Sequence, residues 1–416
     1  MPNFSLRTLL AGLALTLGCV AASAHDASTM PAMHHQDASS EPQCANHALA
    51  CASVATPFVD AHGKLWVVWS ADGAVSIAAS DDAGKHFGAP VVIGRHGARL
   101  DAGVESHPQI AIDRKGRIVV AYGVFKDDNW NAEVMVSHSD DGKTFSPPRP
   151  ISSNPASQRF PVIGFDAHDT LFAAWLDKRT VAAAREHGTQ QPGAALAYAW
   201  SDDAGATFTG EAIADDHTCE CCRIDLGLDR EQHPVVLFRK IYGTNERDHA
   251  VMSFDAARKP TVAHRVAFDH WAIDGCPHHG PALAVSADGT WHAAWLTAGE
   301  ARQGLFYARS TDEGQSFSAP QSVGDAAHQP GRPSLLAQDK SVWLAWKEFD
   351  GQHILAKVRH SSDGGVTWSA DRTVETADGQ SDRPVLVADA NADGKHVYLS
   401  WLTREHGYQL IALDPS

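Results

Sequence analysis

Two short segments of the chain are rich in side chains that bind soft metal ions. The first, "HTCECCRID" from His217, carries three cysteines, and the second, "GCPHHGPALAVS" from Gly275, carries one cysteine and two histidines. Their metal-binding side chains stand at the same offsets before two apolar runs: Cys219, Cys221, Cys222, Cys276, His278 and His279. Thiolate and imidazole together suit zinc or copper, and soft thiolates select Cu(I). Cys51 and His107 precede two earlier apolar runs in a similar phase and join the candidate ligands.

Disulfide bonds are the competing interpretation of these cysteines. Six of the seven cysteines would remain after removal of a leader peptide, and an even number in an oxidising compartment predicts pairing. Cys276 would pair with one of the cysteines at 219–222, and Cys44 with Cys51. A disulfide needs no histidine, so the histidines favour a metal site, but both interpretations stay open.

The N-terminus resembles that of an exported protein. Residues 1–24 combine Arg7, the apolar run "TLLAGLALTLGCVAA" and a small-residue cleavage pattern ending at Ala24, which predicts a signal peptide. Attachment of lipid at Cys19 is the alternative. We therefore expect a periplasmic or secreted protein whose mature chain begins at His25. No other apolar run reaches the roughly 20 residues of a membrane span.

The next segment, residues 25–43, is predicted to be a disordered tail rich in histidine and methionine. Its candidate ligands are His25, Met30, Met33, His34 and His35. Such tails resemble the copper-scavenging segments of bacterial copper-resistance proteins, and a polar linker is the alternative. The formal charge of −16 excludes a nucleic acid as the expected partner, because phosphates require a clustered positive surface.

A repeated motif predicts the fold of residues 44–416. Five segments follow S-x-D-x-G-x-x-F/W, with His138 in place of the leading serine in the second, and they end at Phe87, Phe145, Phe208, Phe317 and Trp368. Seven apolar runs each end in an aromatic residue: Trp69, Tyr122, Trp175, Phe238, Trp295, Trp346 and Trp401. Short apolar runs separated by turn signals are typical of four-stranded antiparallel blades, which stack radially. The pattern predicts an all-β propeller with seven units counted and six blades as the alternative. The last unit, residues 380–416, lacks an outer strand, which we expect the segment before Phe58 to supply.

The Asp-box motif gives the chain a resemblance to the sialidase-like (BNR/Asp-box) β-propeller superfamily, over almost everything after residue 50. That resemblance implies three arginines that hold a substrate carboxylate, an acid/base Asp and a Tyr–Glu nucleophile. Arg159 begins a segment similar to the family's Arg-x-Pro, and Arg332 and Arg383 each precede a proline. No segment resembles the family's region around the nucleophilic tyrosine. By residue type alone, the remaining candidates are Asp177, Glu348 and Tyr408.

These patterns lead to one main hypothesis and two alternatives. The innermost strands of a propeller begin beside its central channel, so the cysteines and histidines ahead of them should meet at the channel mouth. We expect an exported propeller that binds copper, or zinc, there, in metal handling or metal-dependent redox chemistry. The alternatives are an exo-α-sialidase-type hydrolase of acidic glycans and a non-catalytic protein-binding propeller. Whether the chain is an enzyme stays open.

Charged residues from Arg239 to Asp248 lie close in sequence to the cysteine segment. The run "RKIYGTNERDH" includes Arg239, Lys240, Arg247 and Asp248. It would bind an anion, orient the ligands of a metal ion, or form a solvated edge of a blade.

Overall fold

The structure is a computed structural model that describes residues 48–389 and 396–414. The chain divides into a short unit, Met1–Gln43, and a large unit, Cys44–Ser416, and all of the described residues belong to the large unit. The predicted signal peptide and the His/Met-rich tail lie outside the described residues. Within the described ranges, no helix is both long and apolar enough to cross a membrane.

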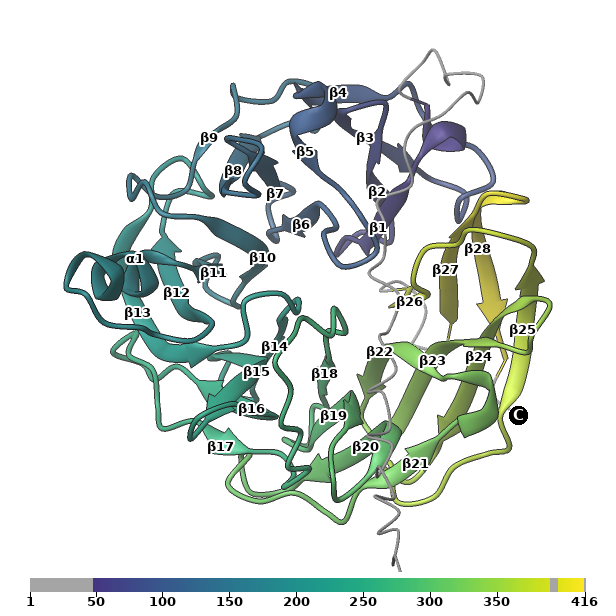
Figure 1. Ribbon diagram of the computed structural model, residues 1–416. Helices are drawn as coiled ribbons and strands as arrows, with labels where there is room; N and C mark the ends of the chain where they lie inside the picture. Colours follow the sequence, from purple (N-terminus) through teal and green to yellow (C-terminus); the bar gives the residue numbers. More distant parts are fainter. Residues whose placement is uncertain (1–47, 390–395, 415–416) are drawn as a thin grey trace, which may run out of the picture. The chain divides into compact units, whose positions relative to one another are not determined.

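The strands follow one another in small antiparallel sheets (Figure 1). The first sheet holds β1 (Val54–Val59), β2 (Leu65–Ala71), β3 (Ala74–Ser80) and β4 (Val91–Arg95). The next holds β5 (Leu100–Asp101), β6 (Gln109–Ile112), β7 (Ile118–Phe125), β8 (Ala132–Ser139) and β9 (Arg149–Pro150). Then come β10 (Gln158–Phe165), β11 (Leu171–Asp177), β12 (Ala194–Ser201) and β13 (Thr209–Thr218), with helix α1 (Arg179–Glu186) between β11 and β12.

The second half of the chain repeats this arrangement. Strands β14 (Asp225–Leu228), β15 (Pro234–Tyr242), β16 (Glu246–Ser253) and β17 (His264–Arg265) are followed by β18 (Ala282–Val285), β19 (Trp291–Ala298), β20 (Gln303–Ser310) and β21 (Gln321–Val323). The last sheets hold β22 (Gly331–Gln338), β23 (Ser341–Phe349), β24 (Ile354–Ser361) and β25 (Arg372–Ala377), and then β26 (Val385–Ala388), β27 (Val397–Thr403) and β28 (Gly407–Leu413). Three short 3₁₀ helices are η1 (Leu49–Cys51), η2 (Gly97–Arg99) and η3 (Ala326–His328).

One strand of each group lies innermost, and these strands contact one another in succession. The innermost strands are β1, β6, β10, β14, β18, β22 and β26, and β26 contacts β1 again (Figure 1). The predicted all-β propeller with four-stranded antiparallel blades is confirmed. The count of seven units stays a prediction, because Thr218 of β13 pairs with Lys240 of β15 and joins two groups into one eight-stranded sheet.

The last sheet differs from the expectation that the segment before Phe58 completes it. In the described part of the chain this sheet has three strands, β26, β27 and β28. The residues just before Phe58 form β1, which pairs with β2 of the first sheet, while η1 contacts β28 without pairing as a strand.

The core lies between neighbouring sheets. Each apolar cluster draws on two successive groups of strands, as where Trp343 of β23 packs with Leu386 and Trp401 of the last sheet. Because a sheet of this size cannot bury both faces by itself, stacking of the sheets supplies the apolar burial.

The five Asp-box motifs form tight turns between the third and fourth strands of their sheets. In each, the serine hydroxyl accepts the N–H of the motif's glycine, at 2.8–2.9 Å. The aspartate carboxylate accepts further backbone N–H groups, as Asp312 does from Ser316 at 2.9 Å. These glycines have positive φ, for example +79° at Gly314, which explains why the motif requires glycine. The motif is therefore structural.

Candidate metal centre

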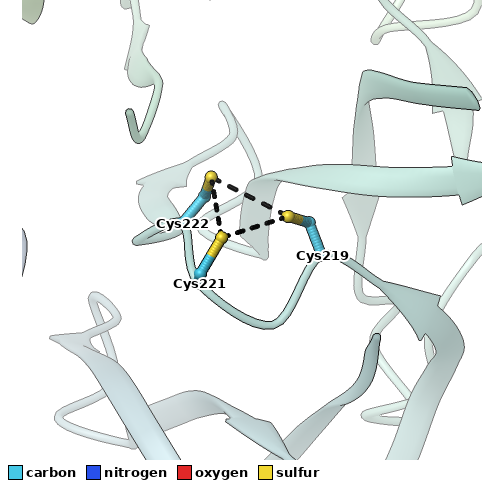
Figure 2. Close-up of side chains that lie close together, drawn as sticks. All are labelled: Cys219, Cys221 and Cys222. Atoms are coloured by element: carbon cyan, nitrogen blue, oxygen red, sulfur yellow. Dashed lines mark hydrogen bonds between the residues drawn. The ribbon is translucent and has the colours of Figure 1, made fainter. Parts of the chain in front are cut away.

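The three clustered cysteines lie on the loop between β13 and β14. Pairing with β15 continues past the end of β13, because the Cys219 N–H donates to the Arg239 carbonyl at 2.8 Å. The chain then turns at Glu220–Cys222 and enters β14 at Asp225. This turn points all three side chains toward one another (Figure 2).

The three sulfur atoms form a nearly equilateral triangle (Figure 2). Cys219 Sγ lies 3.6 Å from Cys221 Sγ and 3.9 Å from Cys222 Sγ, and the last two are 4.0 Å apart. With metal–sulfur bonds of about 2.3 Å, tetrahedral ligands stand about 3.8 Å apart. All three side chains are buried, at 1–3 % exposure. The triangle therefore has the dimensions of three thiolates on one ion.

The four cysteines of the two candidate segments form no disulfide bond in the structure. Cys219, Cys221, Cys222 and Cys276 are all free cysteines. The triangle's sulfur separations are far above the roughly 2.05 Å of a disulfide bond.

The second predicted segment contributes two more ligands beside Cys221. The metal-binding atoms of Cys221, Cys276 and His278 all lie within 4.8 Å of one another. Cys276 is exposed and His278 is partly buried. His278 has a φ of +50°, a left-handed backbone that a residue with a side chain adopts only under local constraint.

Arginines from several elements hold this second loop by its backbone carbonyls. Gly275 O accepts from Arg247 at 3.0 Å, His278 O from Arg332 at 2.6 Å, His279 O from Arg239 at 3.2 Å, and Gly280 O from Arg223 at 3.2 Å. The Gly280 N–H donates to Glu105 Oε2 at 2.9 Å, and Arg332 also pairs with Glu105. The loop is therefore fixed in position by charged groups from distant parts of the chain.

The thiols of the triangle have unequal acidities. Sulfur hydrogen bonds from Cys221 and Cys222, together with the charge of Arg239, hold the pKa of Cys219 well below its usual value. The same hydrogen bonding with Cys219 raises the pKa of Cys221 and raises that of Cys222 to about 11. One thiolate shared between two thiols is the expected state without metal.

The sequence alone left the roles of Arg239 and Arg247 open. Both are buried, so the solvated-edge alternative is wrong for them. Arg247 Nη1 lies 3.3 Å from Cys219 Sγ, and the Arg239 guanidinium stacks on Trp271 with its carbon 4.5 Å from the ring centre. Two buried cations beside three thiols lower the cost of forming thiolates there.

Three other predicted ligands lie apart from the two groups formed by the described residues. His279 is partly buried beside Gly331 of β22, its buried Nδ1 atom lacks a hydrogen-bond partner, and burial lowers its pKa to about 4. His107 Nε2 instead meets Asp382 Oδ1 at 2.8 Å. Cys51 ends η1 and is disulfide-bonded, so the prediction that it is a metal ligand is wrong. The tail ligands lie outside the described residues.

Of the three arginines predicted for a sialidase-type site, Arg159 lies apart from the other two. Arg159 forms a bidentate pair with Asp101, at 2.7 and 2.9 Å. Arg332 pairs with Glu105, and Arg383 is partly buried, where desolvation lowers its pKa to about 10. Arg383 lies close enough to Arg332 for its charge to lower the pKa of Arg332, whereas Arg159 binds Asp101.

Asp177, Glu348 and Tyr408, the catalytic candidates chosen by residue type alone, form hydrogen bonds within the sheets. Asp177 accepts the indole N–H of Trp175 at 3.0 Å, and Glu348 accepts that of Trp346 at 2.7 Å. The Tyr408 hydroxyl accepts from Ser400 at 3.0 Å. Each of these contacts is structural.

No family model and no curated protein matches the chain. Among solved structures, a polysaccharide lyase of family PL25, an ulvan lyase, superposes with a TM-score of 0.59 at 14% identity, over 89% of this chain and 96% of that one. A Hadza microbial sialidase superposes with 0.50 at 16% identity, over 84% and 76%. A Dyadobacter fermentans protein of unknown function gives 0.52 at 17%, over 75% and 95%. At these identities, the likeness shows a shared fold with sialidase-like and polysaccharide lyase propellers.

Proposed function

We propose that this chain is an exported β-propeller that binds a thiophilic metal ion, with copper(I) as the best fit, at Cys219, Cys221 and Cys222. The observation that carries the proposal is the triangle of three buried, free thiols with separations of 3.6–4.0 Å. Beside Cys221, His278 and Cys276 add an imidazole and a fourth thiol, which also bind soft metal ions.

The number and type of donors favour copper(I) over zinc. The buried group has three members, all sulfur, among the residues that the structure describes. Structural zinc sites almost always have four ligands, whereas soft thiolates select Cu(I). Three thiolates around a monovalent ion carry two net negative charges, which the guanidinium groups of Arg239 and Arg247 offset.

The proposed role is metal handling in the periplasm or outside the cell. Burial of all three sulfurs excludes bulk water, which suits retention of an ion. The predicted His/Met-rich tail, residues 25–43, would collect or buffer the ion before it reaches the propeller.

An anaerobic titration with Cu(I) in competition with a chromophoric chelator tests the proposal. Cys222→Ser should weaken the tightest binding by more than the roughly 10- to 100-fold typical of losing a ligand's supporting partner. His353→Ala is the control for adventitious histidine binding, since His353 Nδ1 and Nε2 lie 3.6 and 3.7 Å from Asp350 and Asp378. Unchanged affinity and stoichiometry in Cys222→Ser would refute the proposal.

A glycan-processing enzyme acting on acidic sugars is the second candidate, favoured by the proximity of Arg332 and Arg383. The cavity beside Arg383 has a volume of about 30 Å³, which is room for about one water molecule. A larger cavity of about 1080 Å³ is lined by residues that follow β14, β18 and β22, at the opposite ends of these strands from the cysteine loops. None of the three predicted arginines lines it. Release of a fluorophore from a fluorogenic sialoside, lost in Arg332→Ala, would support this candidate.

A further inference from the structure

We infer that Cys221 is shared by two ion positions, and that metal reaches the buried triangle through an exposed position formed by Cys221, Cys276 and His278. The inference rests on the proposed function and adds a second site and a route to it. The exposed position would take the same class of ion, a soft monovalent cation.

Cys221 belongs to both groups of ligands. It lies in the sulfur triangle, and its sulfur is also within 4.8 Å of the ligand atoms of Cys276 and His278. A thiolate has enough lone pairs to bind two ions at once. Neither ligand group has to rearrange for Cys221 to act as the common ligand.

Exposure falls in one direction through the two groups. Cys276 is exposed and His278 is partly buried, whereas Cys221, Cys222 and Cys219 are 3 %, 1 % and 1 % exposed. An incoming ion therefore meets Cys276 and His278 first. Direct access from solvent to Cys219 or Cys222 would require the turn at Glu220–Cys222 to open.

The transfer is a ligand exchange without electron transfer. The ion first binds the thiolate of Cys276, the imidazole of His278 and the sulfur of Cys221, whose proton leaves to solvent on the exposed side. Cys222 gives its proton to the imidazole of His278 as His278 leaves, and Cys222 bonds to the ion. Cys219, already a thiolate, then bonds to the ion as Cys276 leaves as a thiolate. The ion keeps its charge, and Cys221 stays bonded throughout, so the ion is never released.

The second loop is held in place for this task. Arg247 Nη1 contacts both Cys219 Sγ, at 3.3 Å, and Gly275 O, at 3.0 Å, so one guanidinium links the two ligand loops. Arg332 holds His278 O at 2.6 Å on the other side of Cys276. Ligands held on a fixed scaffold bind without the cost of ordering a loop.

Cu(I) stoichiometry and loading rate of the full-length protein test the inference. Cu(I) would be supplied from a weak chromophoric chelator under anaerobic conditions, and uptake followed by stopped flow. The double variant Cys276→Ser/His278→Gln should bind one ion fewer than the wild type and load its remaining buried ion at least tenfold more slowly. The affinity for that buried ion should stay within about twofold of the wild type.

Two further variants control the experiment. Cys222→Ser should also lose one ion while keeping fast uptake, and His353→Gln should match the wild type in both readouts. X-ray absorption should show metal–metal scattering in the doubly loaded wild type and none in the double variant, a signature that a purely structural role of Cys276 would not change. Circular dichroism checks that each variant is folded.

The outcomes separate this inference from the proposed function. A wild type that binds no Cu(I) overturns both. Normal binding by the wild type, with unchanged stoichiometry or unchanged loading rate in the double variant, overturns the shared-ligand route alone.

Discussion

Arg247 Nη1 lies 3.3 Å from Cys219 Sγ and, from the same nitrogen, 3.0 Å from Gly275 O. The cation therefore contacts the most acidic thiol of the triangle and the start of the loop that carries Cys276. Arg247 comes from β16, next to β15, whose Arg239 carbonyl fixes the Cys219 N–H. One pair of neighbouring strands thus organises both ligand loops.

Replacing Arg247 by Met should weaken Cu(I) binding about 10- to 100-fold, because a thiolate loses its cationic partner and the second loop loses an anchor. The pKa of Cys219 should rise in the metal-free protein, and its alkylation at pH 7 should slow. Arg247→Lys should recover part of the affinity by restoring the charge without the fork of donors. Equal affinity in Arg247→Met and wild type would show that the contact is incidental.

Binding of an ion to the triangle should release about two protons at pH 7. Cys219 is held as a thiolate, whereas the raised pKa values of Cys221 and Cys222 keep both protonated until the ion binds. Affinity should therefore fall as pH falls. Proton release measured with an indicator dye should drop in Cys222→Ser. Release of no protons would mean that the thiols are not the ligands.

The fold should lose stability as pH falls from about 6.5 toward 4. Burial lowers the pKa of His292 to about 4 and that of His249 well below its usual range. A histidine whose folded pKa is depressed stabilises the fold above its unfolded pKa, and this contribution is lost as pH falls. For His292 the loss is about 3 kcal/mol by pH 4. Urea midpoints across this range should show a shallower pH dependence in His292→Gln. An identical slope would contradict this assignment.

Asp382 should contribute to stability and leave metal binding unaffected. Its carboxylate accepts the Ala55 N–H at 3.0 Å and meets His107 at 2.8 Å, which joins the last strands to the first two sheets. Asp382→Ala leaves both groups without an acceptor and should cost about 2–4 kcal/mol of unfolding free energy, and Asp382→Asn less. Chemical denaturation measures this.

The same contact predicts that His107→Gln binds as many Cu(I) ions as the wild type. If that variant bound one ion fewer than the wild type, His107 would have to be a metal ligand.

The fold was predictable because the Asp-box turns and the strands repeat locally in sequence. The meeting of Cys221 with Cys276 was predictable too, since both precede innermost strands that are neighbours. The number of residues between a side chain and its innermost strand predicts that the side chain lies at the channel mouth. It does not predict which side chains of other strands it will contact there. His107 shares the phase, yet it precedes β6 and meets Asp382 instead.

Other features of the site depend on contacts that no local pattern encodes. His278 reaches Cys221 while the adjacent His279 lies against Gly331, a difference set by the left-handed backbone at His278. Glu105 meets the Gly280 N–H from 175 positions away. The run around Arg247 drew attention by its charge, but only the folded chain shows that Arg247 reaches a sulfur.

The most direct test of the copper site is the metal content and free-thiol count of tag-free protein that is purified anaerobically and measured by native mass spectrometry. We expect at least one copper ion per chain and protection of Cys219, Cys221 and Cys222 from alkylation, with loss of one ion and of that protection in Cys222→Ser. Metal-free protein whose three thiols alkylate freely, and which takes up no added Cu(I), would contradict it.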